Sequence, residues 1–335
     1  MEGGSKMNSI VDRGEIWERH PVKLRQITYP TQASEHLLRS CEHAIRARTK
    51  GFVVVSKPLM GLTTALRILV AGWPKLYSGI PIALVRSPGV TVYHPVRFWS
   101  SLVTQLIPNL ATWRNPDALR LGLLRNLLTR ANAHDSDRLL LIVDRAHTLL
   151  PEELLQLAVF QDDLADEGTN LVVALAGYES LRTIRDCLHD EAREEPVRRY
   201  FENEHYLYGI RSSQELAYFL ESFDKCRFPQ GSEWPISRFC FPKAFDRGWR
   251  LWHEAARAWS IFSGYAIREG EPAEVEMQYV TETACSLLES AYQRGSGALP
   301  PDEDAWRIAV QSSGLISSRA MLSQMPESKA PRRRR

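Results

Sequence analysis

Four short apolar runs alternate with amphipathic helical patterns through the middle of the chain, and this alternation limits the fold more than any other feature. We expect strands at 51–56, 80–85, 139–143 and 171–176. Because these runs are apolar at consecutive positions, both faces of the sheet must be covered. The helical patterns between and around them fall at 33–45, 63–71, 95–107, 117–131, 152–165 and 180–188. The pattern predicts an α/β three-layer domain with a mainly parallel sheet over 33–210.

The pattern changes after Gly209, where helical segments rich in aromatic residues follow without a convincing strand. We expect a small helical domain at 211–294. Its tryptophans should fill its core; the alternative is a stacking platform for single strands, with arginines interleaved among the rings. The residues concerned are Trp234, Trp249, Trp252 and Trp259, and Arg247, Arg250 and Arg257.

The two ends of the chain look different from its middle. Residues 1–32 are expected to form an N-terminal extension, and the Gly, Pro, Ser and charged residues of 295–335 predict a flexible basic tail. The whole chain of 335 residues has a formal net charge of only +2, so bulk charge does not predict nucleic-acid binding. The local candidates for DNA contact are the tail residues Arg332, Arg333, Arg334 and Arg335, which equally suit partner docking or a solvated end.

The cysteines and the hydropathy indicate the compartment. Five cysteines are scattered without a CxxC pair, which argues against a disulfide framework and a zinc site. No run of about 18 apolar residues occurs, as a membrane span would need. We therefore expect a cytoplasmic protein that does not cross a membrane.

The loop after the first expected strand resembles a phosphate-binding loop of the form GxxxxGK[ST], in which backbone amides surround phosphates and the lysine pairs with their oxygens. Gly61 and Thr63 match this motif, whereas Ser56 replaces the first glycine and Leu62 replaces the lysine. Lys57 is a candidate substitute for that lysine, or else a solvent-facing residue. The candidate cofactor-binding residues are Ser56, Lys57, Pro58, Leu59, Met60, Gly61, Leu62, Thr63 and Thr64.

The strand at 139–143 leads into Asp144, the arrangement in which a carboxylate holds Mg²⁺ beside the loop hydroxyl. Thr63 and Asp144 are therefore the candidate Mg²⁺ residues, with ATP as the candidate cofactor. The next position, where many such ATPases carry a glutamate that polarises water, is Arg145. An arginine cannot act as a general base near neutral pH. The pattern thus predicts weak or absent hydrolysis and leaves open whether the chain is an enzyme.

An arginine downstream of the fourth strand is the third candidate element. In oligomeric ATPases, such an arginine stabilises charge on the phosphate held by a neighbouring subunit. Arg199 is the first candidate and Arg198 the second. The alternative is a surface arginine that pairs with Glu194, Glu195 or Glu202.

Several segments in order resemble one family. Tyr29-Pro30, the Val-Val-Val strand, Gly-x-Thr-Thr-Ala-Leu, LLLIVDRAHTL, ALAGYESL and VRRYF are similar to segments of the AAA+ ATP-binding transposition regulators of the TniB/TnsC type, relatives of the Mu B protein. The resemblance covers about residues 20–293. Asp144 and His147 match the family's VDEAH segment, whereas Arg145 departs from it. Tyr178 stands where a small polar residue is usual in the family's GTxEL turn.

The resemblance implies a bacterial, DNA-associated P-loop AAA+ domain with a helical lid at 211–294. It also implies a homo-oligomeric ring or filament on double-stranded DNA, with ATP and Mg²⁺ at subunit interfaces, which links a TniQ-like target selector to a DDE transposase. The altered motifs imply a degenerate nucleotide site. Two alternatives stay open: an active ATPase with a non-standard loop lysine, and a nucleotide-free AAA+-fold adaptor.

Overall fold

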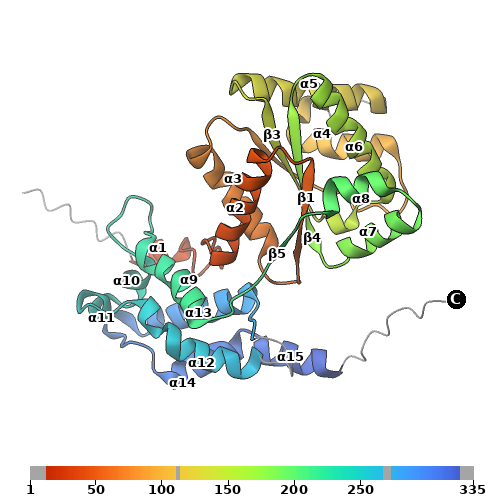
Figure 1. Ribbon diagram of the computed structural model, residues 1–335. Coiled ribbons are helices and arrows are strands. Elements are labelled where there is room, and N and C mark those ends of the chain that lie inside the picture. The colour runs from red at the N-terminus through yellow and green to blue at the C-terminus, as the bar shows by residue number, and fades with distance from the viewer. Residues whose placement is uncertain (1–12, 111–113, 267–272, 325–335) are drawn as a thin grey trace, which may run out of the picture. The chain divides into compact units, whose positions relative to one another are not determined.

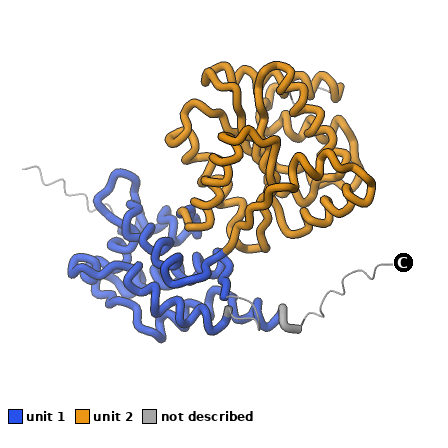
Figure 2. Tube along the Cα trace, viewed as in Figure 1, with its two compact units in different colours: residues 1–29, 209–335 blue, residues 30–208 orange. Residues whose placement is uncertain are grey.

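The computed structural model describes residues 13–110, 114–266 and 273–324. Two compact units divide the chain (Figure 2). Pro30–Tyr208 forms one, called here the sheet unit, and Met1–Tyr29 with Gly209–Arg335 forms the other, called the helical unit. The polypeptide therefore passes from the helical unit into the sheet unit and back again.

A parallel sheet of five strands lies at the centre of the sheet unit (Figure 1). Its strands, in the order β2-β3-β4-β1-β5, all run in the same direction. The bounds are β1 Gly51–Ser56, β2 Ile82–Arg86, β3 Arg138–Asp144, β4 Asn170–Tyr178 and β5 Glu204–Leu207. The four expected strands and their parallel arrangement are confirmed. The edge strand β5 was not expected, because half of its four residues are polar.

Helices cover both faces of the sheet, as the apolar runs require. Val54 and Ile142 contribute to the apolar cluster shared with α2 (Gln32–Arg46) and α3 (Leu62–Leu76). Val53 contributes to the cluster on the opposite face. The elements on that face are α4 (Pro95–Leu106), α5 (Pro116–Ala133), η2 (Ala146–Thr148), α6 (Pro151–Asp166), α7 (Leu181–Asp190) and α8 (Glu194–Phe201), and η1 (Pro108–Leu110) follows α4 in the chain.

Capping residues in the sequence determine where several of these helices begin. At the start of α2, Thr31 Oγ1 accepts a hydrogen bond from the Ser34 amide, and Ser34 Oγ accepts one from the Thr31 amide. Asn115 Oδ1 accepts from two amides at the start of α5, where Pro116 occupies the first helical position. Each cap satisfies amides that have no partner within the helix.

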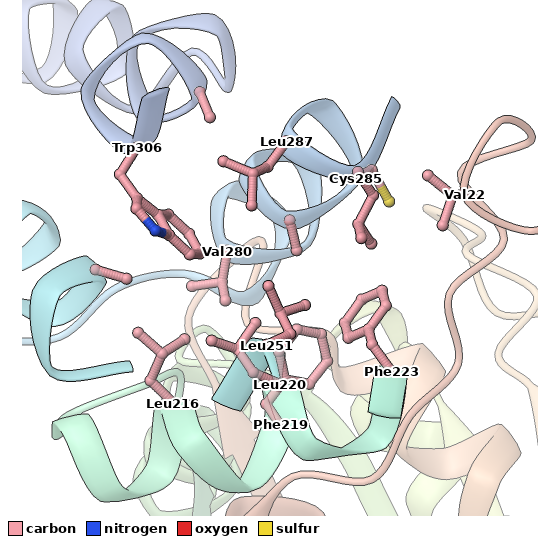
Figure 3. Packing of buried hydrophobic residues seen from close by; sticks show 14 of the residues in the cluster. Val22, Leu216, Phe219, Leu220, Phe223, Leu251, Val280, Cys285, Leu287 and Trp306 are labelled. Atoms are coloured by element: carbon pink, nitrogen blue, oxygen red, sulfur yellow. The ribbon is translucent and has the colours of Figure 1, made fainter. Parts of the chain in front are cut away.

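The helical unit is built around one apolar cluster in which helix faces interdigitate (Figure 3). Leu220 and Phe223 of α9 meet Val280 and Cys285 of α13 in this core. The elements are α1 (Arg13–Glu18), α9 (Ser213–Lys225), α10 (Ile236–Cys240), α11 (Pro242–Asp246), η3 (Leu251–Glu254), α12 (Ala255–Ala266), α13 (Met277–Gln293), η4 (Gly295–Gly297), α14 (Glu303–Ser312) and α15 (Leu315–Gln324). None of the helices in the described part of the chain is both long and apolar enough to cross a membrane.

The expectation of a flexible tail from residue 295 onward is wrong for the segment that contains α14 and α15. Asp302 caps α14 by accepting a hydrogen bond from the Ala305 amide at 2.8 Å. Trp306 and Val310, four residues apart on one face, are buried in the core of the helical unit. The candidate DNA residues Arg332 to Arg335 lie outside the described residues.

Residues 13–29, which were expected to form part of a separate N-terminal extension, pack into the helical unit. The Trp17 ring stacks on the ring of Tyr292 with centroids 4.0 Å apart and lies near Phe239. Val22 is fully buried in the same core. Residues far apart in the chain thus fold together.

The tryptophans of the helical unit divide between core and surface. Trp249 and Trp259 pack against the apolar core, whereas Trp234 and Trp252 are more than 40% exposed. Two of the interleaved arginines are already bound within the unit. Arg250 donates to the carbonyls of Phe245 and Trp249, and Arg257 pairs with Glu254. The expected core role therefore holds for two of the four tryptophans, Trp249 and Trp259.

Replacing Trp306 with alanine should lower the free energy of unfolding of the helical unit by about 3–5 kcal/mol, because the side chain is almost completely buried. The matched control is Ile308→Ala on the same helix, whose side chain is 63% exposed and whose loss should cost less than about 0.5 kcal/mol. Urea unfolding followed by circular dichroism measures both. Equal stability of the two variants would contradict the place of α14 in the core.

Stability should fall on acidification, because each unit holds a histidine whose pKa is lowered by burial, His20 completely buried and His205 half-buried. Burial lowers the pKa of His20, which lies between Trp17 and Phe239, from 6.5 to about 4. Burial, with a further contribution from His36, lowers the pKa of His205 to about 4. Between pH 6.5 and 4 the unfolded chain binds protons that the folded chain rejects, so the free energy of unfolding decreases through this window.

For His20 the full decrease is about 3 kcal/mol. His20→Phe should preserve the ring stack and flatten this part of the pH dependence, whereas His94→Phe, at an exposed position, should not. Urea unfolding at a series of pH values measures the slope. The prediction fails if wild type and His20→Phe lose stability equally between pH 6.5 and 4.

Candidate functional site

The turn between β1 and α3 lies at the edge of the sheet where the strands end. Ser56, the last residue of β1, is in register with Tyr178 of β4 and Leu207 of β5. Gly61 precedes α3 in the left-handed conformation, with φ of 83°. No side-chain hydrogen bond caps α3, so its first amides are not satisfied by a side chain. Such a helix start suits an anion.

The two candidate Mg²⁺ residues meet at this edge. The Thr63 hydroxyl donates to Asp144, with its oxygen 3.2 Å from Oδ2 and 3.4 Å from Oδ1. Asp144 is only 4% exposed, and its Oδ1 also accepts from the Arg145 amide at 2.8 Å. Hydroxyl and carboxylate oxygens are ligands that Mg²⁺ accepts, directly or through water. The donor types therefore fit the metal, and their pairing follows from the strand and loop identified in the sequence.

Two other loop residues have structural roles. Leu62, at the position of the lysine, is 6% exposed and packs in the apolar cluster shared by α2, α3 and the sheet. Ser56 is fully buried, and its hydroxyl lies 2.9 Å from the carbonyl oxygen of Leu207 in the neighbouring strand. Met60 is buried, whereas Pro58 and Leu59 are exposed. The side chain at position 62 thus belongs to the core.

Arg86 is a site residue that the sequence did not reveal. It ends β2 in register with Asp144, and its Nε lies 3.9 Å from Asp144 Oδ2. Gln105 of α4 holds its backbone at both polar groups: Oε1 accepts from the Arg86 amide at 2.8 Å, and Nε2 donates to the Arg86 carbonyl at 3.0 Å. The available signal was a charge at the end of an otherwise apolar run. That charge can be assigned to the Asp144 site only when β3 is known to be the neighbour of β2.

Arg145 follows Asp144 in the left-handed conformation, with φ of 57°. Its amide donates to Asp144, and its carbonyl accepts from the Thr148 amide at 2.9 Å. The side chain is exposed and makes no hydrogen bond or ion pair with the described residues. Position 145 therefore places a cation, and no general base, beside the candidate metal carboxylate.

His147 connects this turn to β4. Its Nδ1 accepts a hydrogen bond from the Tyr178 amide at 3.2 Å, and the two rings lie with centroids 4.5 Å apart. Burial lowers the pKa of His147, the charge of Asp144 opposes that change, and Arg145 adds to it. A Cβ at Gly177 would approach the His147 amide nitrogen to 2.8 Å, so a glycine is needed for this close contact. These contacts link the VDRAH and GYESL segments.

Arg199 is bound within its own chain. Its two terminal nitrogens donate to the two carboxylate oxygens of Asp162 at 2.9 and 3.0 Å, and one of them also donates to the Ala158 carbonyl. It also pairs with Glu195, and only 11% of its side chain is exposed. The hydrogen bond from Arg199 lowers the pKa of Asp162. This arrangement corresponds to the alternative of a structural ion pair, although with Asp162 as the main partner.

Arg198 is the more accessible of the two candidate arginines. Its side chain is 74% exposed and pairs only with Glu194 among the described residues, at 3.1 Å. A surface pair of this kind contributes little stability. A neighbouring subunit could therefore compete for Arg198 at far lower cost than for Arg199.

Comparison with known proteins identifies the fold. No protein-family model and no curated protein matches the chain. The chain is similar to the ORC2 protein of Aeropyrum pernix, solved in ADPNP–ADP complexes, with a TM-score of 0.51, 15% identity, and coverage of 84% of this chain and 66% of that one. It is also similar to the Walker-type ATPase paby2304 of Pyrococcus abyssi, with a TM-score of 0.51, 12% identity, and coverage of 89% and 75%. The chain therefore has the AAA+ P-loop ATPase fold, as the resemblance implied.

Gly177→Ala should destabilise the sheet unit by about 1–3 kcal/mol, because the added Cβ would meet the His147 backbone and ring. Gly72→Ala is the matched control: its Cβ would contact nothing within 4 Å, and alanine within α3 should stabilise by about 0.5–1 kcal/mol. Thermal unfolding compares the two variants. A Gly177→Ala protein as stable as wild type would show that the turn does not depend on this contact.

Proposed function

We propose that this chain is a DNA-associated AAA+-fold regulator of transposition with a degenerate nucleotide site. It assembles as a homo-oligomeric ring or filament on double-stranded DNA in the bacterial cytoplasm, and it links a TniQ-like target selector to a DDE transposase. One observation carries the nucleotide part of the proposal. Thr63 and Asp144 meet as a metal-binding pair would, while positions 62 and 145 hold a buried leucine and an arginine.

The support for nucleotide binding comes from the loop and from the fold. The left-handed Gly61 and the uncapped start of α3 offer amides to phosphates. The ORC2 protein, which shares this fold, was solved with ADPNP and ADP. When bound, ATP would supply the charged phosphates for this loop, and Thr63 and Asp144 are the side chains that would contact Mg²⁺ if the nucleotide brought it.

The expectation of weak or absent hydrolysis follows from two side chains. Leu62 cannot offset charge on the phosphates, and its burial keeps it in the core. Arg145 cannot take a proton from water near neutral pH. Without these two functions the site retains elements for binding but lacks elements that stabilise a transition state. Nucleotide binding would then serve assembly and not turnover.

The transposition part of the proposal is supported by the order of segments that resemble the TniB/TnsC type. Two of these segments contact each other in the folded chain, through His147 and Tyr178. The two alternatives predict different behaviour: a working ATPase in which Lys57 replaces the lost lysine would release phosphate, and an adaptor without nucleotide would not bind DNA in a length-dependent way.

The test is assembly of the full chain on duplex DNA of increasing length, with ATP, ADP or no nucleotide, followed by fluorescence anisotropy and negative-stain imaging. We expect rings or filaments that depend on DNA length and are lost as salt is raised. Phosphate release measured in the same samples should stay at the background of a protein-free control.

Each result has a clear meaning. Phosphate release that depends on the chain and is abolished by Lys57→Ala would establish the ATPase alternative. Absence of DNA-dependent assembly at low salt would refute the proposal and favour the adaptor. Replacing Arg332 to Arg335 with serine tests the tail: if these residues contact phosphates, the dependence of log affinity on log salt should become shallower by up to about 4.

A further inference from the structure

We propose that Arg86 takes the place of the divalent metal in this site, so that the chain binds nucleotide phosphates without Mg²⁺. The inference rests on the nucleotide site of the proposed function and identifies the cation that this site uses. It is carried by the position of Arg86 beside the carboxylate that would otherwise hold the metal.

The first step of the argument concerns the space around Asp144. Its two carboxylate oxygens already face the Thr63 hydroxyl, the Arg145 amide and, at 3.9 Å, Arg86 Nε. A buried carboxylate needs a compensating charge, and Arg86 is the nearest cation to it that the described residues provide. A divalent ion beside Asp144 would be repelled by this guanidinium. The carboxylate charge of Asp144, which would attract Mg²⁺, is thus already offset by the chain itself.

The second step concerns how Arg86 is held. The side-chain amide of Gln105 forms two hydrogen bonds with the Arg86 backbone, and β2 is an edge strand of the sheet that the described residues form. These bonds determine where the Arg86 side chain starts. The Arg86 side chain therefore extends from a backbone position that α4 holds in place.

The third step concerns what Arg86 can still bind. Its side chain is 47% exposed, and its Nε lies 3.9 Å from Asp144 Oδ2, beyond hydrogen-bond distance. Among the described residues, no acceptor is bound to its terminal nitrogens. A guanidinium can donate two parallel hydrogen bonds to phosphate oxygens, and it stays charged at every relevant pH. With Arg145 exposed next to Asp144, this edge carries two arginines against one carboxylate, which suits a metal-free polyphosphate.

The experiment measures binding of a fluorescent ATP analogue to the full chain by anisotropy, with excess MgCl₂ or with EDTA. Wild type should bind equally well or better in EDTA. Arg86→Ala should bind about tenfold or more weakly in EDTA, and adding MgCl₂ should restore part of the affinity because Asp144 and Thr63 become accessible to the metal. Arg125→Ala, which removes an exposed arginine from α5, is the matched control and should behave as wild type.

A second readout needs no nucleotide. Binding of Mn²⁺, followed by electron paramagnetic resonance, should be absent or weak in wild type, should increase in Arg86→Ala, and should be lost again when Asp144→Asn is added. A wild type that needs Mg²⁺ to bind the analogue, that binds it in neither condition, or that is matched by Arg86→Ala in both assays would overturn the inference.

The two proposals fail separately. If the analogue binds in EDTA and depends on Arg86 but no assembly on duplex DNA occurs, the transposition proposal fails and the role of Arg86 stands. If assembly on DNA occurs but analogue binding needs Mg²⁺ or is absent, the role of Arg86 fails and the transposition proposal stands.

Discussion

The chemistry of this chain depends on one geometric constraint: parallel strands deliver all their carboxyl ends to the same edge of the sheet. Segments up to 81 residues apart in the sequence therefore meet there: Asp144 lies beside both Thr63 and Arg86. The order β2-β3-β4-β1-β5 also leaves β1 between two strands that come later in the chain. Ligands of open α/β sheets bind at such an edge, where the connections diverge.

At this edge the chain keeps the framework of a phosphate site and changes its charges. Gly61 and the Thr63–Asp144 pair preserve the geometry of a phosphate-binding loop. Leu62, in contrast, removes the cation of the usual lysine, and burial of its side chain stabilises the fold by about 2 kcal/mol. The substitution therefore favours folding at the expense of ligand charge. Two other residues supply positive charge near Asp144: Arg86 at the end of the edge strand β2, and Arg145 in the turn after β3.

The sequence allowed prediction of what depends on local hydrophobic pattern. Strands β1, β3 and β4 are apolar on both faces, and the Thr63–Asp144 pair follows from a strand and a loop with recognisable motifs. Strand β5 escaped prediction because its partner on β1, and not its own composition, makes it a strand. Helices α14 and α15 were hidden by the polar and glycine-rich residues before them, and Arg86 by its dependence on strand order. Dependence on non-local pairing explains why β5 and Arg86 were missed, whereas the start of α14 carries a local signal in its capping Asp302.

The stacking of Trp17 on Tyr292 has a consequence for the order of folding during synthesis. The sheet unit is complete once Tyr208 has left the ribosome, and its own core needs nothing that follows. Residues 13–29 of the helical unit are made before the sheet unit, yet their apolar side chains are buried only after α13 and α14, which follow the sheet unit, have been made. Trp17 and Val22 are thus made early but buried late, and until then they are accessible to chaperones and prone to aggregation.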